Sequence, residues 1–422
     1  MRRYDEYKDT GMVWLTKLPS HWGKRKLKYC FSERSEKNHP EEQMLCATQS
    51  HGVIPQSMYQ NRVVVVNKGF EGLKLVKVGD FVISLRSFEG GIEYAYYQGI
   101  ISAAYTILTP TEKQFTDYFK VLFKSLPFIQ LLQTCVTGIR EGQNINYPLL
   151  GRKFIPIPPL AEQEKIVSYL ESKTLCIDAY VRERERELQL LNELKESEIA
   201  NVVTQGLNPD VKMKDSRIPW LDSIPEHWSE ERAKYLFNRE NRPISDSDDI
   251  ITCFRDGQVT LRKNRRTTGF TESFKEFGYQ GIRKGDLVIH QMDAFAGSVG
   301  ISDSDGKGTP VYIVCTPKRQ DVYNPYFAIV IREMGMNGYI QSLYRGIRER
   351  SSDFKFDVFR QQCLPLPPIE EQQAIVAYIE ERSNKVNSLI GELEAEITYL
   401  KEYKQKLIAD CVTGQINVQS EI

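Results

Sequence analysis

The sequence lacks the residue patterns that mark most metal sites. Its eight cysteines are scattered singly with no CxxC pair, and its five histidines show no HExxH spacing. Because zinc needs clustered ligands, we expect no metal site. Isolated cysteines are typical of free thiols in a reducing compartment, which predicts a cytoplasmic location.

Long apolar runs and a leader-like start are also missing. No apolar run approaches the ~18 residues expected of a membrane span, so the sequence predicts no membrane partner. Residues 1–11 carry charges with no apolar stretch behind them, which argues against a secretory signal. A surplus of basic residues is missing as well, since 56 Lys and Arg balance 56 Asp and Glu. Proteins that bind nucleic acid usually show such a surplus, so the total argues against that class.

What the sequence does contain is a tandem repeat. WLTKLPSHW (14–22) matches WLDSIPEHW (220–228), and KVGDFVIS (77–84) matches RKGDLVIH (283–290), both at an offset of 206 residues. PIPPLAEQEKIV (156–167) matches PLPPIEEQQAIV (365–376) at an offset of 209. Self-similarity at a nearly fixed offset indicates one unit of about 208 residues, duplicated.

Each unit begins with a part of mixed composition. β-branched and apolar runs separated by Gly- and Pro-rich turns predict strands at 63–66, 81–85, 104–108, 286–290 and 311–315. Helical stretches are predicted near 115–135 and 322–345. The expected class of this part is α+β.

Each unit ends in a long helix. Residues 161–204 and 370–413 contain no proline and, apart from Gly391, no glycine, and a Pro-Pro pair precedes each run. Gly206 and Gly414 are placed as C-terminal caps. Runs of this length favour an antiparallel coiled coil between the two helices, although two helices packing separately on their own domains remain an alternative. The predicted seam consists of Ile177, Val181, Leu188, Leu191, Leu194, Val386, Leu393, Ile397, Leu400 and Leu407.

The predicted architecture is therefore two similar α+β domains and two long helices in a pseudo-twofold internal repeat. The boundaries are 1–157 for the first domain, 158–206 for the first helix, 207–366 for the second domain and 367–422 for the second helix.

Counted by segment, the charges are not balanced. The mixed parts, 1–156 and 209–364, carry +7 and +2, whereas the helical parts, 157–208 and 365–422, carry −4 and −5. Segregated charge suggests separate partners, which reopens nucleic acid as a partner of the domains.

Basic residues also cluster locally within the domains. LRKNRR (261–266), YRGIRER (344–350) and TGIREGQNINY (137–147) bring together Arg, Gln and Asn, which can pair with base edges in the major groove, and cations that hold phosphates. The candidate DNA-binding residues are Arg86, Arg140, Gln143, Asn144, Asn146, Arg262, Lys263, Arg265, Arg266, His290, Arg345, Arg348 and Arg350.

No catalytic constellation is predicted. Asn324-Pro325-Tyr326-Phe327 resembles half of a methyltransferase motif, but only Tyr-Phe recurs at 118–119, which indicates helix packing. The glycines lack a GxGxxG context, and no paired carboxylate or Ser/His/Asp arrangement recurs in both halves.

On the basis of these repeated motifs, the chain resembles the specificity (S) subunit of type I restriction–modification enzymes along essentially its whole length. WLTKLPSHW and WLDSIPEHW are similar to that family's domain-opening motif, the two Gly-Asp segments to its strand entry, and the two Pro-Pro-Leu/Ile-x-Glu-Gln segments to its helix starts. The resemblance implies two target recognition domains, each reading one half of a split DNA sequence, and helices that set the gap.

The resemblance also implies partners and an absence of catalysis. An S subunit binds double-stranded DNA, docks two methyltransferase (M) subunits and joins two restriction/motor (R) subunits through them. S-adenosylmethionine, ATP and Mg would be bound by those subunits and no cofactor by this chain. GIREGQNIN (138–146) and GIRERSSDF (346–354) share Gly-Ile-Arg and differ over most of the residues that follow, which predicts different half-sites and an asymmetric target.

Two other functions remain open from the sequence. A pure assembly scaffold would bind protein through both domains and no DNA, and the +9 on the domains argues against it. A methyltransferase acting alone lacks its cofactor motif.

The two recurring arginines give the first testable prediction. Arg140→Ala and Arg348→Ala are expected to weaken DNA binding without unfolding either domain. Because both recur in domains with different targets, they are better suited to contact phosphate or maintain structure than to select bases. Titration at physiological salt checks this, and unchanged affinity contradicts it.

Overall fold

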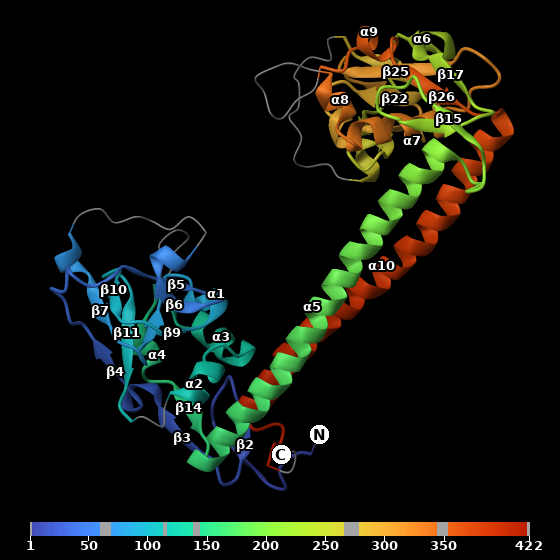
Figure 1. Ribbon diagram of the computed structural model, residues 1–422. Coiled ribbons are helices and arrows are strands. Elements are labelled where there is room, and N and C mark those ends of the chain that lie inside the picture. Colours follow the sequence, from blue (N-terminus) through green and yellow to red (C-terminus); the bar gives the residue numbers. More distant parts are fainter. Residues whose placement is uncertain are drawn as a thin grey trace. The chain divides into compact units, whose positions relative to one another are not determined.

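The computed structural model describes residues 2–59, 69–112, 116–137, 144–265, 278–343 and 353–419. The chain divides into two compact units, Met1–Arg186 with Leu393–Ile422, and Glu187–Glu392. Each unit holds one mixed domain and one stretch of each of two long helices (Figure 1). The predicted strand at 63–66 lies outside the described residues.

The first domain is built on a four-stranded antiparallel sheet of order β4-β11-β8-β9. β11 (Thr106–Pro110) pairs with β4 (Phe31–Arg34) on one side and β8 (Phe81–Ile83) on the other, and β9 (Glu93–Tyr94) follows β8. The other elements are the strand pairs β1 (Tyr7–Asp9) with β2 (Lys17–Pro19), β3 (Gly23–Lys26) with β14 (Phe154–Ile157), β5 (Leu45–Thr48) with β6 (Gly52–Pro55), β7 (Lys74–Val76) with β10 (Gly99–Ile101) and β12 (Val136–Thr137) with β13 (Asn144–Ile145), and the helices α1 (Ser87–Gly90), α2 (Asp117–Leu122), α3 (Leu126–Gln133) and α4 (Tyr147–Leu150).

The second domain repeats this plan with a sheet of order β18-β25-β22-β23. β25 (Tyr312–Pro317) lies between β18 (Phe237–Glu240) and β22 (Leu287–His290), and β23 (Val299–Ile301) pairs with β22. The other elements are the strand pairs β15 (Met213–Asp215) with β16 (Ser223–Pro225), β17 (Ser229–Arg232) with β26 (Cys363–Leu366), β19 (Ile251–Cys253) with β20 (Val259–Leu261) and β21 (Gln280–Ile282) with β24 (Gly306–Gly308), and the helices α6 (Ala233–Leu236), α7 (Asn324–Met336), α8 (Tyr339–Ser342) and α9 (Phe356–Phe359).

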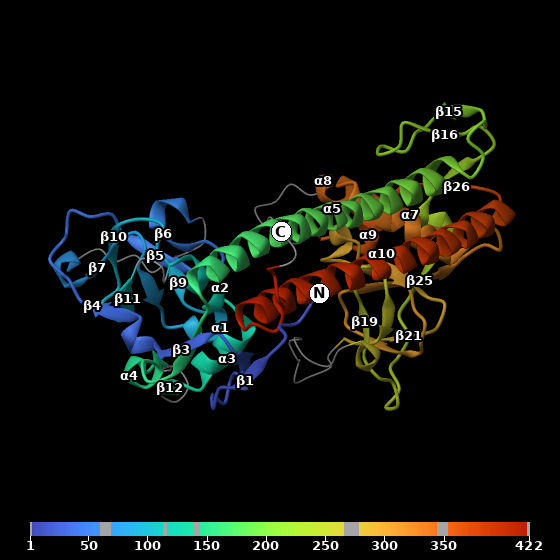
Figure 2. The same cartoon turned by 90° about the horizontal axis from the view of Figure 1, so that it is seen from below.

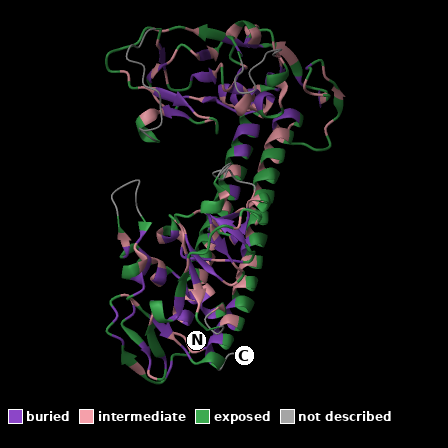
Figure 3. Cartoon of the chain, turned by 90° about the vertical axis from the view of Figure 1, so that its left-hand side faces the viewer, coloured by how far each residue is buried: buried purple, intermediate pink, exposed green. Residues whose placement is uncertain are grey.

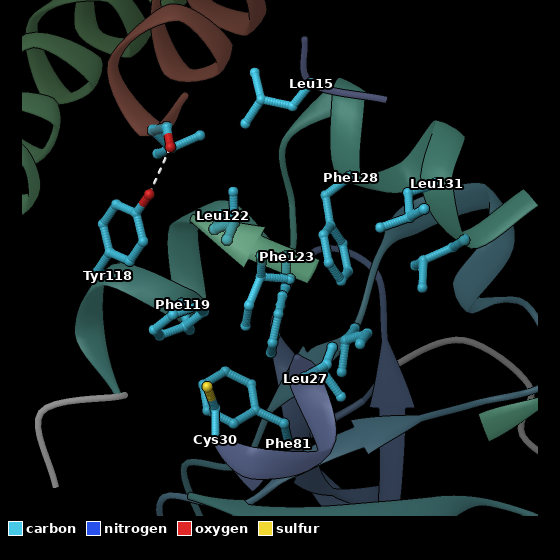
Figure 4. Close-up of a cluster of buried hydrophobic side chains, with 14 of the residues drawn as sticks. Leu15, Leu27, Cys30, Phe81, Tyr118, Phe119, Leu122, Phe123, Phe128 and Leu131 are labelled. Carbon is cyan, nitrogen blue, oxygen red and sulfur yellow. Dashed lines mark hydrogen bonds between the residues drawn. The ribbon is translucent and has the colours of Figure 1, made fainter. Parts of the chain in front are cut away.

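Aromatic side chains fill the core between sheet and helices in both domains. In the first, the ring of Phe31 lies 5.5 Å from the rings of both Phe81 and Phe119, joining strands β4 and β8 to helix α2. Figure 4 shows Phe81 and Phe119 in this core. In the second, the ring of Phe237 lies 5.3 Å from that of Phe327 on α7. Edge-on aromatic contacts of this kind stabilise a packed core beyond the area they bury. Phe119 and Phe327 belong to the recurring Tyr-Phe pair, whose predicted packing role is confirmed.

The two long helices are α5 (Leu160–Gln205) and α10 (Ile369–Val412). Both start just after the Pro-Pro pairs, since proline fits the first turn but removes donors from later ones. Both end at a glycine with left-handed backbone, Gly206 at φ 80° and Gly414 at φ 70°. The predicted α+β class with two long helices in an internal repeat is therefore confirmed.

Within each unit the two helices run antiparallel and side by side (Figures 1 and 2). In the first unit, Lys404 Nζ lies 2.6 Å from Asp178 Oδ1 and Lys401 Nζ lies 2.8 Å from Glu185 Oε1. In the second, the Arg382 guanidinium donates to Glu198 at 2.9 Å. These helix acids are thus matched by cations on the facing helix, while the outward faces are exposed (Figure 3).

Each domain is seated on the start of one helix and the end of the other. In the first unit, Ile166 and Leu170 of α5 share a core with Cys411 and Val412 of α10. The second unit repeats this with the helices exchanged, because its core holds Val203 of α5 together with the start of α10. A buried tyrosine marks each seat: Tyr118 Oη donates to the carbonyl of Val412 at 2.5 Å, as Figure 4 draws, and Tyr326 Oη donates to the carbonyl of Val203 at 2.9 Å.

These tyrosine hydrogen bonds satisfy carbonyls of the last helical turn, which have no partner within the helix. Tyr326→Phe is expected to lower the free energy of unfolding by about 1–3 kcal/mol, because the buried carbonyl of Val203 loses its donor. Urea unfolding of the full chain measures the loss. Tyr235→Phe, at a half-exposed site, is the matched control, and equal effects of the two variants contradict the prediction.

The motifs that open the domains contact the motifs that start the helices. His21 Nε2 lies 2.8 Å from Glu162 Oε2, and His227 Nε2 lies 2.8 Å from Glu371 Oε2. Trp228 Nε1 also donates to Glu371 at 3.0 Å. The two most recognisable parts of the repeat therefore form one joint in each unit.

Candidate nucleic-acid interface

The second domain carries a cleft of about 680 Å³ at one edge of its sheet. One wall is the hairpin β19–β20 with the turn at 254–257, and the other is the end of β22 with the turn at 293–298. β19 is buried throughout, whereas Arg255 and Asp256, which follow it in the turn, are exposed. The lining residues are Thr252, Cys253, Phe254, Arg255, Asp256, Arg262, Arg265, His290, Asp293, Ser298 and Tyr312.

Two arginines of the cleft are held by aspartates. Arg255 Nη2 lies 2.8 Å from Asp293 Oδ1, across the cleft from one turn to the other. Arg265 Nη2 lies 2.6 Å from Asp256 Oδ2, and its guanidinium carbon lies 4.3 Å from the ring centre of Phe254. A guanidinium fixed by a carboxylate or an aromatic face keeps other N–H groups for a ligand.

His290 forms the floor of the cleft as a neutral side chain. Burial lowers the pKa of His290, and the charge of Asp293 only partly offsets this. Its Nδ1 accepts from the backbone N–H groups of Met292 and Asp293, both at 3.2 Å, so the ring proton is assigned to Nε2. Nε2 lies 3.6 Å from Asp293 Oδ2, so His290 lines the cleft beside this carboxylate without adding a charge.

The predicted DNA-binding residues of the second domain are only partly brought together. Arg262, Arg265 and His290, separated by up to 28 positions, all line the cleft. Lys263 lies outside it and pairs with Asp249 at 2.5 Å. The remaining predicted residues of this domain, Arg266, Arg345, Arg348 and Arg350, lie outside the described residues.

The predicted residues of the first domain are more scattered. Arg86 is exposed just before α1, and Asn144 is exposed on β13. Asn146 is the N-cap of α4, and its Oδ1 accepts from the backbone of Leu149 at 3.0 Å. The structure thus gives Asn146 a capping role, because an asparagine before a short helix satisfies an otherwise unpaired N–H, and its contact with a base stays a prediction. Arg140 and Gln143 lie outside the described residues.

Arg255 and its partner Asp293 are not among the residues predicted from the sequence. Arg255 stands alone between Phe254 and Asp256, with no other cation nearby in sequence, so no cluster marked it. Its partner Asp293 is 38 positions away. The internal repeat was the signal that could have pointed to Arg255. At the offset of 206, Arg255 corresponds to Gln49, so the two copies differ at this position.

A cation from a later segment fixes this loop in both domains, from α7 in the second and from the turn between α2 and α3 in the first. Arg332 Nη1 donates to the carbonyls of Arg255 at 2.7 Å and of Gly297 at 2.6 Å. In the first domain, Lys124 Nζ donates to the carbonyls of Gln49 at 3.3 Å and of Gly90 at 2.9 Å. The same two loops are therefore tied together in each domain, while the side chains that they present differ.

The predicted helix seam is largely buried. Val181, Val386, Ile397 and Leu407 are buried; Ile177, Leu188, Leu191, Leu393 and Leu400 are half-buried. Leu194 is 52% exposed and lies outside the seam, because Lys195 instead faces the other helix and donates to Asn387 at 2.8 Å.

Another cavity of the second unit, of about 600 Å³, is lined by a half-buried acid. Glu333 of α7 lies in it, with residues 192–200 of α5 and Ile379 and Ser383 of α10 on the other side. Burial raises the pKa of Glu333 to about 7, although Arg332 lowers it in part. The carboxyl is therefore protonated more readily in the folded state than in the unfolded state.

This shift predicts a pH dependence of stability. The stabilising contribution of Glu333 is complete below its unfolded pKa of about 4.5 and is lost as pH rises through about 7. Between pH 4.5 and 8, the free energy of unfolding of the wild type should fall relative to Glu333→Gln by up to about 3 kcal/mol. Urea unfolding across this range measures it, with exposed Glu392→Gln as control. A difference that does not change with pH contradicts the prediction.

Among the described residues, no group of His, Cys, Asp or Glu could hold a metal ion. No helix in the described part of the chain is long and apolar enough to cross a membrane. All eight cysteines are free thiols, and six of them are buried.

Two curated proteins are similar in sequence. The type I restriction enzyme EcoBI specificity subunit of Escherichia coli is 23% identical over 283 residues, covering 63% of this chain and 59% of that protein. The type I restriction enzyme MjaVIII specificity subunit of Methanocaldococcus jannaschii is 21% identical over 362 residues, covering 82% of this chain and 81% of that protein. The match thus spans less than two thirds of the E. coli subunit. No protein-family model matches the chain.

Two solved structures share the fold. One, from a study of complex assembly and conformational transition of the type I R-M system, has a TM-score of 0.67 at 16% identity and covers 94% of this chain and 99% of that chain. The HsdS subunit from Thermoanaerobacter tengcongensis has a TM-score of 0.53 at 15% identity and covers 94% of this chain and 98% of that chain. By sequence relatives and by fold alike, this chain is similar to the specificity (S) subunits of type I restriction–modification enzymes, as its motifs predict.

Proposed function

We propose that this chain is the non-catalytic subunit that gives a type I restriction–modification enzyme its DNA sequence specificity. The observation that carries the proposal is the repeated domain, seated on exchanged helix ends, with an arginine-lined cleft in its second copy. The relatives, named specificity subunits, support the same role. Arginine forks held by carboxylates suit polar recognition of base edges and need no catalytic group.

Each domain reads one half of a bipartite DNA target in this proposal. The domain boundaries are 1–157 and 207–366, with spacer helices at 158–206 and 367–422. The helices set the gap between the half-sites. Different side chains on equivalent loops, such as Gln49 and Arg255, favour two different half-sites and an asymmetric target.

The proposed partners follow from the same role. Two M subunits dock on the helices, and two R subunits join through them, all in the cytoplasm. S-adenosylmethionine, ATP and Mg belong to those subunits. The acidic, exposed outer faces of α5 and α10 support protein docking, since they would repel DNA.

Binding to random duplex distinguishes this proposal from a pure assembly scaffold. We expect the full chain to retain random 40-base-pair duplex on filters at low salt. The logarithm of the affinity should fall linearly with the logarithm of salt concentration, because phosphate contacts release counterions. Heparin, an acidic polymer, should compete with the duplex for binding to the chain. Absence of retention at low salt contradicts DNA recognition and supports the scaffold.

A further inference from the structure

Arg255 and Gln49 occupy the same position in the equivalent loops of the two domains. Their carbonyls are the ones that Arg332 and Lys124 tie to the neighbouring turn, and their side chains are exposed at the surface of the loop. The strands on either side correspond at an offset of 206, since β5 and β6 match β19 and β20. The two domains therefore keep the same loop framework and change the side chain that it presents.

The chemistry of Arg255 argues for base contact over phosphate contact. Its hydrogen bond to Asp293 uses one of five guanidinium donors and fixes the plane of the fork. Arg265 is likewise matched by Asp256, so the charges of both arginines are compensated by carboxylates. A site that bound phosphate would bind it more tightly with uncompensated positive charge. A site that reads a base instead becomes more selective when the guanidinium fork is held in one orientation.

We propose that this single loop position selects a base in each domain, guanine through Arg255 and adenine through Gln49. An arginine fork pairs with the O6 and N7 atoms of guanine, and a glutamine amide pairs with the N6 and N7 atoms of adenine, both in the major groove. Asp293 and Arg332 are positioning residues, one for the guanidinium and one for the backbone beneath it. This inference rests on the proposed DNA recognition and names the bases that it involves.

The test is selection of bound duplexes from a randomised double-stranded library by the full chain. Arg255→Gln is expected to lose guanine at one position of one half-site and to favour adenine there. Gln49→Arg is expected to change one adenine position of the other half-site toward guanine. The wild-type preference at each position should be about 5- to 150-fold over other bases. Lys318→Gln, which removes an exposed cation of the same domain outside the cleft, is the matched control and should leave the selected sequence unchanged.

Asp293→Asn separates base reading from charge. It removes a negative charge, so affinity for random duplex should stay equal or rise, while the guanine preference should fall at least several-fold because the fork is no longer held. Circular dichroism confirms that each variant is folded. The inference is overturned if Arg255→Gln and Gln49→Arg weaken all sequences equally and leave every base preference unchanged. If the wild type itself enriches no sequence, the proposed function fails together with the inference.

Discussion

Replacing Trp228 with alanine is expected to lower the free energy of unfolding by about 3–5 kcal/mol. The indole is 1% exposed and packs edge-on against Tyr326, with ring centres 6.4 Å apart. Its Nε1 donates to Glu371 at the start of α10. The substitution therefore opens a cavity at the point where the domain-opening motif, α7 and the long helices meet.

Urea unfolding of the full chain measures this loss. Trp228→Phe keeps most of the apolar volume and removes only the donor to Glu371, so we expect a smaller loss of about 1–2 kcal/mol. Leu194→Ala, at an exposed helix position, should change the free energy of unfolding by less than about 0.5 kcal/mol. A Trp228→Ala variant as stable as Leu194→Ala contradicts the role of this joint.

Removing one heptad from each long helix is expected to abolish recognition of the wild-type target. Residues 188–194 and 386–392 lie at the same level of the pair, as the contact of Lys195 with Asn387 indicates. Their removal shortens each helix by about 10.5 Å, or about three base pairs of duplex. If both half-sites must be bound at once, affinity for the wild-type target should fall at least 100-fold, because the second contact is no longer intramolecular.

A length-preserving control separates spacing from surface chemistry. Replacing the exposed residues Gln189, Asn192 and Glu193 with alanine keeps the helix length and should leave target affinity within about threefold. Competition binding against the wild-type target measures both variants. Unchanged target choice after the double deletion would mean that the helices do not set the gap.

The internal repeat made much of the fold predictable from sequence. An offset that drifts by only three residues from the domain-opening motif to the helix start requires two copies of one topology, and both copies have the same sheet order. The helix ends were equally clear, because Pro-Pro pairs and glycines at 206 and 414 act through local backbone geometry. Long, strongly punctuated elements need no knowledge of distant contacts.

The candidate site was less predictable, because its residues meet only through the tertiary fold. Arg262, Arg265 and His290 could be chosen by residue type, but the pairing of Arg255 with Asp293 joins two turns that no local pattern connects. Arg184 shows the same limit on the helices. It stands one heptad after Ile177, at a position that would be apolar in a regular seam. Its guanidinium lies over the ring of Tyr180, 4.7 Å from the ring centre, with Glu396 nearby.

The balanced total charge also takes on a physical meaning in the structure. Helix acids face cations of the opposite helix, as Asp178 faces Lys404, and cleft arginines face aspartates. The domains keep a net surplus of positive charge and the helices a deficit. A zero sum is thus compatible with DNA binding by the domains.

Methylation mapping tests the central claim most directly. A host that carries this chain together with its methyltransferase and restriction partners is sequenced for modified bases, and the same host without this chain is the control. The account predicts chain-dependent methylation within one non-palindromic target made of two different half-sites at a fixed gap. Methylation of a single continuous palindrome, or methylation that does not depend on the chain, would contradict it.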